Sequence, residues 1–258
     1  MFDLKGKAVL AAGGAGYLSV PSCLGMAQHG ANIVVADINM KGIEQRLAEL
    51  RHAAPGAMIE GVALDIGDEA SIKNALNFAV EFLGRLDVLI IATYLSIGDL
   101  VEELKGPDLD RALHVNVTGA FLLAREASQY MKDGGSMIFF SSMYGEIAPD
   151  PRNYPPHIKP NPIEYGLSKA ALEQMVRYLA VHWAPRNIRV NGIAPGAFPH
   201  SQQQREDPAW MKMLGERAPL GRIGRQDEVA GAVVYLASNE ASYVTGHILN
   251  VDGGWTIW

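Results

Sequence analysis

Residues 8–37 read AVLAAGGAGYLSVPSCLGMAQHGANIVVAD and contain a short apolar run, a cluster of glycines, a helical pattern and a second apolar run that ends in an acid. Short apolar runs bounded by glycines are typical of buried strands. Asp37 lies 21 residues after Gly16, a separation that suits a carboxylate bonding the ribose hydroxyls of a dinucleotide. The pattern predicts a strand, a glycine turn over a pyrophosphate, a helix and a second strand.

The rest of the chain continues this alternation. The run at 87–92 is nearly all apolar, as expected for a strand buried on both faces of a parallel sheet. No internal repeat or interdomain linker interrupts the order. The predicted strands cover residues 8–12, 33–36, 59–64, 87–92, 137–140, 189–193 and 247–251, and the predicted helices residues 18–30, 43–52, 71–83, 108–131, 163–183 and 227–237.

Composition excludes several classes of protein. The chain has 258 residues, 48% of them hydrophobic, which is ample for a core. The net charge of −6 argues against nucleic acid or an anionic membrane as a partner, and no apolar run approaches the roughly 20 residues of a membrane span. Residues 1–7 lack the apolar segment of a signal peptide, and Cys23 is the single cysteine, so we expect a cytoplasmic protein. The seven histidines are scattered, and we expect no metal.

Two residues at the start of the helix predicted at 163–183 have chemical potential. Tyr165 and Lys169 are four residues apart and therefore share one helix face. A free phenol has a pKa near 10, so proton transfer near pH 7 requires a shift of roughly three units, about 4 kcal/mol. A neighbouring ammonium favours the phenolate and moves the pKa in that direction. The spacing predicts a tyrosine acid or base, although surface pairs also show it, and the hydroxyl of Ser142 is suited to orient a substrate oxygen.

A serine followed by Tyr-x-x-x-Lys, behind a dinucleotide-binding unit, resembles the active-site pattern of the short-chain dehydrogenase/reductase family. The resemblance covers essentially the whole chain. It implies one doubly wound α/β domain of the Rossmann type over residues 1–258, with a parallel sheet of about seven strands and helices on both faces. It also implies hydride transfer between a nicotinamide cofactor and a secondary alcohol or ketone, with Tyr165 as the proton donor or acceptor and Lys169 lowering its pKa and holding the nicotinamide ribose.

Two further catalytic residues follow from the resemblance. The segment 114–119 carries the family's Asn-x-x-Gly pattern, in which the asparagine bends the helix and holds a water that links the lysine to solvent. By the family's Ser-x-x-Gly register, Ser142 rather than Ser141 orients the carbonyl. The implied catalytic tetrad is Asn116, Ser142, Tyr165 and Lys169.

The glycine turn departs from the family pattern Thr-Gly-x-x-x-Gly-x-Gly, which falls on residues 12–19. Gly13 is kept, but Tyr17 and Ser19 stand where the second and third glycines are expected. Either Gly14 and Gly16 now shape the turn, which we expect, or cofactor binding is weakened and the protein is a non-catalytic nucleotide-binding or regulatory protein. The family's Asn-Asn-Ala-Gly is also replaced, by residues 91–94.

Asp37 bears on the choice of cofactor. Its carboxylate accepts ribose hydroxyls but repels a 2′-phosphate, and no Arg or Lys lies in residues 36–40 or in the glycine turn, so we expect NAD rather than NADP. The alternatives are that Asp37 caps a helix from Lys41, and that Asp68 caps the next one. The resemblance adds an acid on the adenine side and a Pro-Gly turn that lies against the nicotinamide. The expected cofactor contacts are therefore Gly13, Gly14, Gly16, Tyr17, Leu18, Asp37, Asp65, Ile66, Ala92, Tyr165, Lys169, Pro195, Gly196 and Phe198.

An insertion separates Ser142 from Tyr165 and contains six prolines in residues 149–162. A loop between two catalytic residues must border the substrate, and its basic and aromatic residues suit a sugar, sugar acid or nucleotide sugar. The alternatives are a stiff surface excursion or subunit contact, and a 3-oxoacyl-type or other ketone as substrate. The candidate substrate contacts are Tyr144, Arg152, Tyr154, His157 and Lys159.

The C-terminal part resembles the family's substrate-covering segment, at residues 197–217, followed by its closing helix and strand. The tail 255–258 reads WTIW and is too apolar to lie comfortably in water. We expect it to contact another subunit, and the resemblance implies a homo-oligomer, most often a tetramer, that binds a small-molecule substrate.

Overall fold

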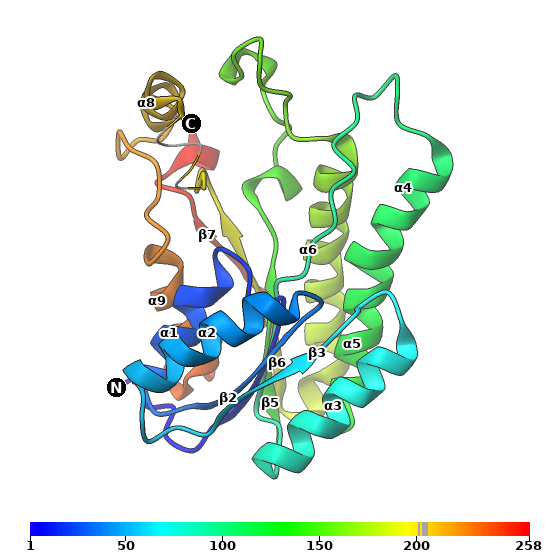
Figure 1. The fold of residues 1–258 in the computed structure, drawn as a ribbon, viewed down its shortest axis with the longest axis vertical. Helices are drawn as coiled ribbons and strands as arrows, with labels where there is room; N and C mark the ends of the chain where they lie inside the picture. The colour runs from blue at the N-terminus through cyan, green and yellow to red at the C-terminus, as the bar shows by residue number, and fades with distance from the viewer. Residues whose placement is uncertain (201, 203–205) are drawn as a thin grey trace.

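Seven parallel strands form one sheet in the computed structural model, which describes residues 1–200, 202 and 206–258 (Figure 1). The order is β3-β2-β1-β4-β5-β6-β7, so the direction of winding reverses between β1 and β4. Loops that leave the carboxyl ends of these two central strands diverge to opposite faces and open a crevice, where such folds bind ligands. The strands are β1 (Ala8–Ala12), β2 (Asn32–Asp37), β3 (Ile59–Ala63), β4 (Val88–Ile91), β5 (Gly135–Phe140), β6 (Ile188–Pro195) and β7 (Ile248–Val251).

Helices cover both faces of the sheet, which confirms the predicted doubly wound fold (Figure 1). One face packs against α1 (Ser19–Gln28), α2 (Met40–Ala53) and α9 (Glu228–Ala237). The other packs against α3 (Glu69–Leu83), α5 (Gly119–Ser128) and α6 (Ile163–Trp183). Among the described residues, no helix combines the length and the hydropathy needed to cross a lipid bilayer.

The helix predicted over residues 108–131 is not continuous. It consists of α4 (Gly106–Leu113), a π-helical turn at His114–Thr118 and α5. Asn116 lies at the centre of the π turn, where one extra residue is inserted into the helical repeat. At the start of α5, Gly119 packs directly on the backbone of Ile66, so that a methyl group at this position would overlap the Ile66 carbonyl oxygen.

A third apolar cluster lies beyond the carboxyl edge of the sheet and joins distant parts of the chain. Helix α8 (Pro208–Glu216) packs there against Trp255 of the tail and against the Pro-rich segment. The indole N–H of Trp210 donates to the carbonyl of Asn153 at 2.7 Å and fixes that segment to α8. In the tail itself Trp255 is buried, whereas Ile257 and Trp258 are exposed.

Glycine at position 119 should be required by packing. Gly119→Ala should lower the free energy of unfolding by about 2–4 kcal/mol, because the added methyl group must displace backbone. Gly231→Ala is the control, since this glycine lies on the exposed face of α9 with nothing within 4 Å of the added atom, and it should gain about 0.5–1 kcal/mol from helix propensity. Urea unfolding followed by circular dichroism measures both, and equal effects would contradict the packing argument.

Candidate active site

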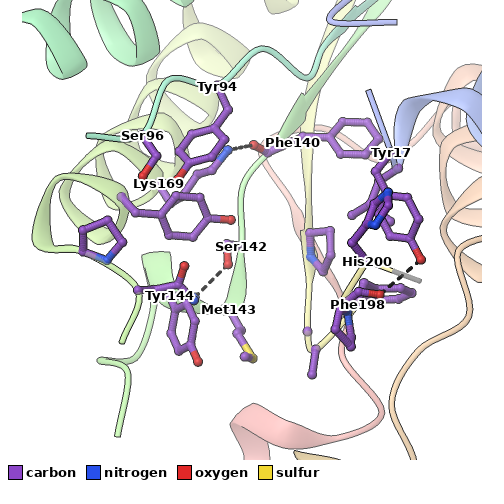
Figure 2. A pocket seen from close by; sticks show the side chains of 18 of the residues that line it. Tyr17, Tyr94, Ser96, Phe140, Ser142, Met143, Tyr144, Lys169, Phe198 and His200 are labelled. Carbon is purple, nitrogen blue, oxygen red and sulfur yellow. Dashed lines mark hydrogen bonds between the residues drawn. The ribbon is translucent and has the colours of Figure 1, made fainter. Parts of the chain in front are cut away.

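A cavity of about 610 Å³ opens at the carboxyl edge of the sheet (Figure 2). The glycine turn and the start of α1 form one side, and the end of β5 with the start of α6 forms the other. Strand β6 ends between them at Pro195 and Gly196. The volume suits a small organic ligand together with part of a cofactor. No cluster of three or more His, Cys, Asp or Glu suited to a metal occurs within the described ranges.

Ser142 and Tyr165 meet in this cavity. Ser142 leaves the end of β5 and starts a short 3-10 turn, in which its Oγ accepts the N–H of Tyr144 at 3.2 Å. Tyr165 lies in the first turn of α6 and its hydroxyl is hydrogen-bonded to Ser142. Two hydroxyl groups 23 residues apart in the sequence therefore lie side by side and are both available to one substrate oxygen.

Lys169 lies one turn after Tyr165 and is buried. Its Nζ donates to the carbonyl oxygen of Phe140 at 2.7 Å and lies 5.4 Å from the centre of the Tyr165 ring (Figure 2). Burial disfavours the charged form and lowers the pKa of Lys169 to about 8. The side chain is therefore a cation at neutral pH that is close to losing its proton.

The pKa of Tyr165 does not move in the direction expected from its spacing to Lys169. Burial raises the pKa of the phenol to about 12, and the hydrogen bond with Ser142 offsets only part of that rise. The ammonium of Lys169 is directed at the Phe140 carbonyl rather than at the phenol oxygen. The structure thus shows a tyrosine that is protonated at neutral pH.

Asn116 supports the site from behind. Its Oδ1 accepts the N–H of Leu95 at 2.7 Å, and its Nδ2 donates to the Leu95 carbonyl at 2.8 Å and to Ser168 Oγ at 3.3 Å. The side chain thus ties the loop that follows β4 to α6. Ser142, Tyr165 and Lys169 line the cavity, whereas Asn116 lies outside its wall.

Close backbone packing shapes the glycine turn. Gly13 has φ +72°, and a methyl group there would lie 2.7 Å from the Ala92 carbonyl, while one at Gly14 would lie 2.7 Å from the Ala11 carbonyl oxygen. Gly16 lines the cavity. Helix α1 begins three residues later at Ser19, and among the described residues no side chain caps it. Its first two amides, those of Ser19 and Val20, donate to the Gly16 carbonyl at 3.1 Å. The positive end of the α1 dipole lies at this end of the cavity and suits a phosphate, so this end fits a dinucleotide.

Tyr17 joins this turn to the chain that leaves β6. Its hydroxyl donates to the Pro199 carbonyl at 3.2 Å, and its ring centre lies 5.0 Å from that of His200 (Figure 2). The side chain of Gln226 donates to the Tyr17 carbonyl. Leu18, Ala92 and Phe198 lie in the same wall of the cavity. The bulky residue at a family glycine position thus forms part of the cavity mouth.

The acids expected on the adenosine side lie beyond the cavity wall. The Asp37 carboxylate accepts the N–H groups of Ala15 at 3.2 Å and of Asn39 at 3.0 Å, next to the glycine turn. The alternative that Asp37 caps the following helix is wrong, because Asn39 caps α2. Asp65 accepts an amide in its own loop, that of Gly67. The side chain of Asp68 caps α3, which confirms the capping alternative for that residue. Ile66, another expected cofactor contact, is buried.

The expected substrate contacts divide into two groups. Tyr144, Tyr154 and Lys159 line the cavity, and the hydroxyls of the two tyrosines are 2.8 Å apart. Arg152 is instead paired with Asp150, and His157 with Asp207, and neither lines the cavity. Sequence reasoning missed several lining residues, among them Tyr94, Ser96, Asn161 and Trp210, because these lie in irregular loops or on a short helix.

Comparison with known proteins agrees with this geometry. A family model described as "Enoyl-(Acyl carrier protein) reductase" matches residues 22–256. Sorbose reductase from Schizosaccharomyces pombe is 36% identical over 260 residues, which cover 99% of this chain and 98% of the relative. The chain belongs to the short-chain dehydrogenase/reductase family. It is therefore an oxidoreductase of a family that binds a nicotinamide cofactor and small-molecule substrates.

Other members of the family differ in substrate. The 3-oxoacyl-[acyl-carrier-protein] reductase of Thermotoga maritima is 31% identical over 256 residues, covering 98% of this chain and 99% of the relative. The crystal structure of a gluconate 5-dehydrogenase from Burkholderia cenocepacia, in complex with NADP and tartrate, superposes with a TM-score of 0.87. It is 27% identical and covers 99% of this chain and 97% of that one. The dehydrogenase/reductase fold is thus shared over the full length.

The buried ammonium of Lys169 should make stability depend on pH. Its pKa is about 8 in the folded chain against 10.5 in the open chain. Between these values only the unfolded chain keeps the proton, so stability rises with pH in this window. The free energy of unfolding of the wild type minus that of Lys169→Met should rise by roughly 3 kcal/mol from pH 7.5 to 10.5. Urea unfolding measures these free energies, and the control Lys212→Met, at an exposed position, should show the same pH dependence as the wild type. A difference between wild type and Lys169→Met that does not change with pH would contradict the lowered pKa of Lys169.

Proposed function

We propose that this protein is an NAD(H)-dependent oxidoreductase that interconverts a secondary alcohol and a ketone on a sugar, sugar acid or nucleotide sugar. One observation carries the proposal. Ser142, Tyr165 and Lys169 line the same cavity as Gly16 of the glycine turn and the start of α1. The proton-transfer group and the phosphate-binding end therefore face one space, as hydride transfer to a bound carbonyl requires.

The side chains divide the work of carbonyl reduction. The bound cofactor supplies or accepts the hydride. The hydroxyls of Ser142 and Tyr165 bind the carbonyl oxygen, and Tyr165 gives it a proton. A phenol pKa of about 12 keeps that proton in place at neutral pH. The Lys169 ammonium is bonded to the Phe140 carbonyl but lies 5.4 Å from the Tyr165 ring centre, and its positive charge there favours the phenolate once the proton has left. Reduction is thus favoured at neutral pH, and alcohol oxidation, which needs the phenolate, is favoured at higher pH.

Asp37 supports NAD over NADP. Two backbone amides hold its carboxylate at the end of β2, beside the glycine turn. A 2′-phosphate placed there would meet a fixed negative charge, while ribose hydroxyls would meet an acceptor. NADP, which the gluconate 5-dehydrogenase relative binds, is the alternative.

The lining of the cavity supports a hydroxyl-rich substrate. Tyr144 and Tyr154 share a hydrogen bond, and Asn161 Nδ2 donates to the Tyr154 hydroxyl at 3.2 Å, so the Asn161 amide oxygen and the Ser96 hydroxyl remain suited to substrate hydroxyls. Lys159 lines the cavity with its Nζ 4.0 Å from a Glu103 carboxylate oxygen, and its charge suits an acid group. The similarity of the chain to a sorbose reductase also supports a sugar substrate.

Two alternatives are less well supported. The Thermotoga maritima relative supports a 3-oxoacyl-type or other ketone substrate. Tyr17 and the replaced residues 91–94 support a non-catalytic nucleotide-binding protein. The second alternative gives no reason why the hydroxyls of Ser142 and Tyr165 and the Lys169 ammonium remain together in one cavity.

Family resemblance also leads us to propose a cytoplasmic homotetramer acting in carbohydrate metabolism. Apolar side chains on the outer face of α6 support assembly, because Tyr178 is 67% exposed and Val181 is 78% exposed. The exposed residues Ile257 and Trp258 of the tail support a second contact.

Cofactor choice can be measured by energy transfer from tryptophan to the reduced nicotinamide. The wild type should bind NADH at least about tenfold more tightly than NADPH, and Asp37→Ser should reduce this preference at least about tenfold, because the fixed charge beside the ribose is removed. Asp68→Asn is the control. It keeps the side-chain cap of α3, which lies away from the cavity, and should leave the preference for NADH unchanged. Tighter binding of NADPH by the wild type would overturn the NAD assignment.

Substrate class can be measured with NADH and a panel of L-sorbose, 5-keto-D-gluconate and an acetoacetyl thioester. Turnover should be highest with one of the first two. In Tyr165→Phe it should fall by about 10²–10⁴ while NADH affinity stays within about threefold, because only the transferred proton is lost. Tyr178→Phe, an exposed position on the same helix, should keep full activity. Full turnover by Tyr165→Phe would refute the mechanism, and preference for the thioester would favour the 3-oxoacyl alternative.

A further inference from the structure

Glu164, the residue before Tyr165, is completely buried in the first turn of α6. Its Oε1 accepts two backbone amides, those of Ile97 and Gly98, each at 3.0 Å. Its Oε2 is also buried and has no hydrogen-bond partner among the described residues. Burial of a polar side chain without a cation beside it is costly, so a polar residue at this position must do more than fill space.

The segment that Glu164 holds forms one wall of the active site. Residues 94–98 follow β4, and Tyr94, Ser96 and Gly98 line the cavity. The Tyr94 ring lies edge-on to the Tyr165 ring, with 5.0 Å between the ring centres. Any displacement of this segment therefore moves the surface against which a substrate at Tyr165 must pack.

The same segment is tied from a second side. The Asn116 amide bonds both the N–H and the carbonyl of Leu95. Glu164 bonds the amides of Ile97 and Gly98. Four backbone groups within residues 95–98 are therefore held by two side chains of the helical layer. Two amides bonded to one side-chain oxygen fix the end of the segment that Asn116 does not reach, and the reach of Glu164 places that oxygen.

We propose that Glu164 is a positioning residue that holds residues 96–98 so that Tyr94 and Ser96 form the substrate wall beside Tyr165. The kinetic part of this inference rests on the proposed function, whereas the clamp itself does not. A purely structural explanation is that an acid in the first turn of α6 complements the helix dipole. That role needs the charge near the helix end but not the reach of Oε1 to the segment.

Three variants separate reach from charge. Glu164→Gln keeps an acceptor oxygen at the same distance and loses the charge. Glu164→Asp keeps the charge and withdraws the oxygen by one methylene group, and Glu164→Ala removes both. Glu69→Gln is the matched control, because Glu69 also lies in the first turn of a helix, α3, but is exposed.

Hydrogen exchange of the peptide containing residues 93–100 measures the clamp without substrate or cofactor. Exchange should be at least about tenfold faster in Glu164→Asp and Glu164→Ala than in the wild type, and within about threefold in Glu164→Gln and Glu69→Gln. The opposite order, with Asp like the wild type and Gln like Ala, would overturn the proposal in favour of the helix dipole. If the Asp and Ala variants fail to fold, the wild type alone decides, because unprotected amides at Ile97 and Gly98 would also overturn it.

Kinetics with L-sorbose and NADH test the consequence for substrate binding. In Glu164→Asp the KM for L-sorbose should rise about tenfold while the Kd for NADH stays within about threefold, and Glu164→Gln should restore the KM. A lowered melting temperature with an unchanged KM would refute the positioning role. If the wild type reduces neither L-sorbose nor 5-keto-D-gluconate, the proposed substrate class fails, and the exchange result still decides the clamp.

Discussion

The hydrogen bond from the Lys169 ammonium to the Phe140 carbonyl joins helix α6 to the last residue of strand β5. This bond is buried, and so it fixes the helix against the strand more firmly than a surface contact would. Ser142 leaves the strand two residues beyond Phe140, and Tyr165 lies one helical turn before Lys169. This charge-assisted bond, together with the packing of α6 on the sheet, holds the Ser142 and Tyr165 hydroxyls in their mutual position.

The loops at the carboxyl edge are ordered by polar side chains that the sheet and helices bury. Asn116 and Glu164 hold the chain that follows β4, and the Trp210 indole holds the Pro-rich segment. Each bond satisfies a backbone group that would otherwise have lost its contact with water. The cavity can therefore have walls of irregular chain and still present side chains in fixed places, which substrate recognition requires.

The residues of the glycine turn that depart from the family pattern are accommodated within the turn and its immediate neighbours. Gly13 and Gly14 make the close backbone contacts with neighbouring strands, and Gly16 faces the cavity. Tyr17, at a family glycine position, reaches across to Pro199 and closes part of the mouth. The turn keeps its path because the sites where a side chain would collide with backbone are still glycine, while the Tyr17 side chain extends away from the turn toward Pro199 and His200.

The sequence by itself determined the seven strands, the helices that flank them and the Tyr165–Lys169 pair, because these follow from local periodicity and from spacing within one helix. Tertiary structure alone decided the direction of the Tyr165 pKa, since burial by distant residues outweighs a neighbour on the same helix. It also decided that His157 pairs with Asp207, 50 residues further along the chain, and that Glu164 holds residues 97 and 98. These outcomes depend on contacts between segments far apart in the chain, and no local pattern encodes which of several polar residues such contacts will bury.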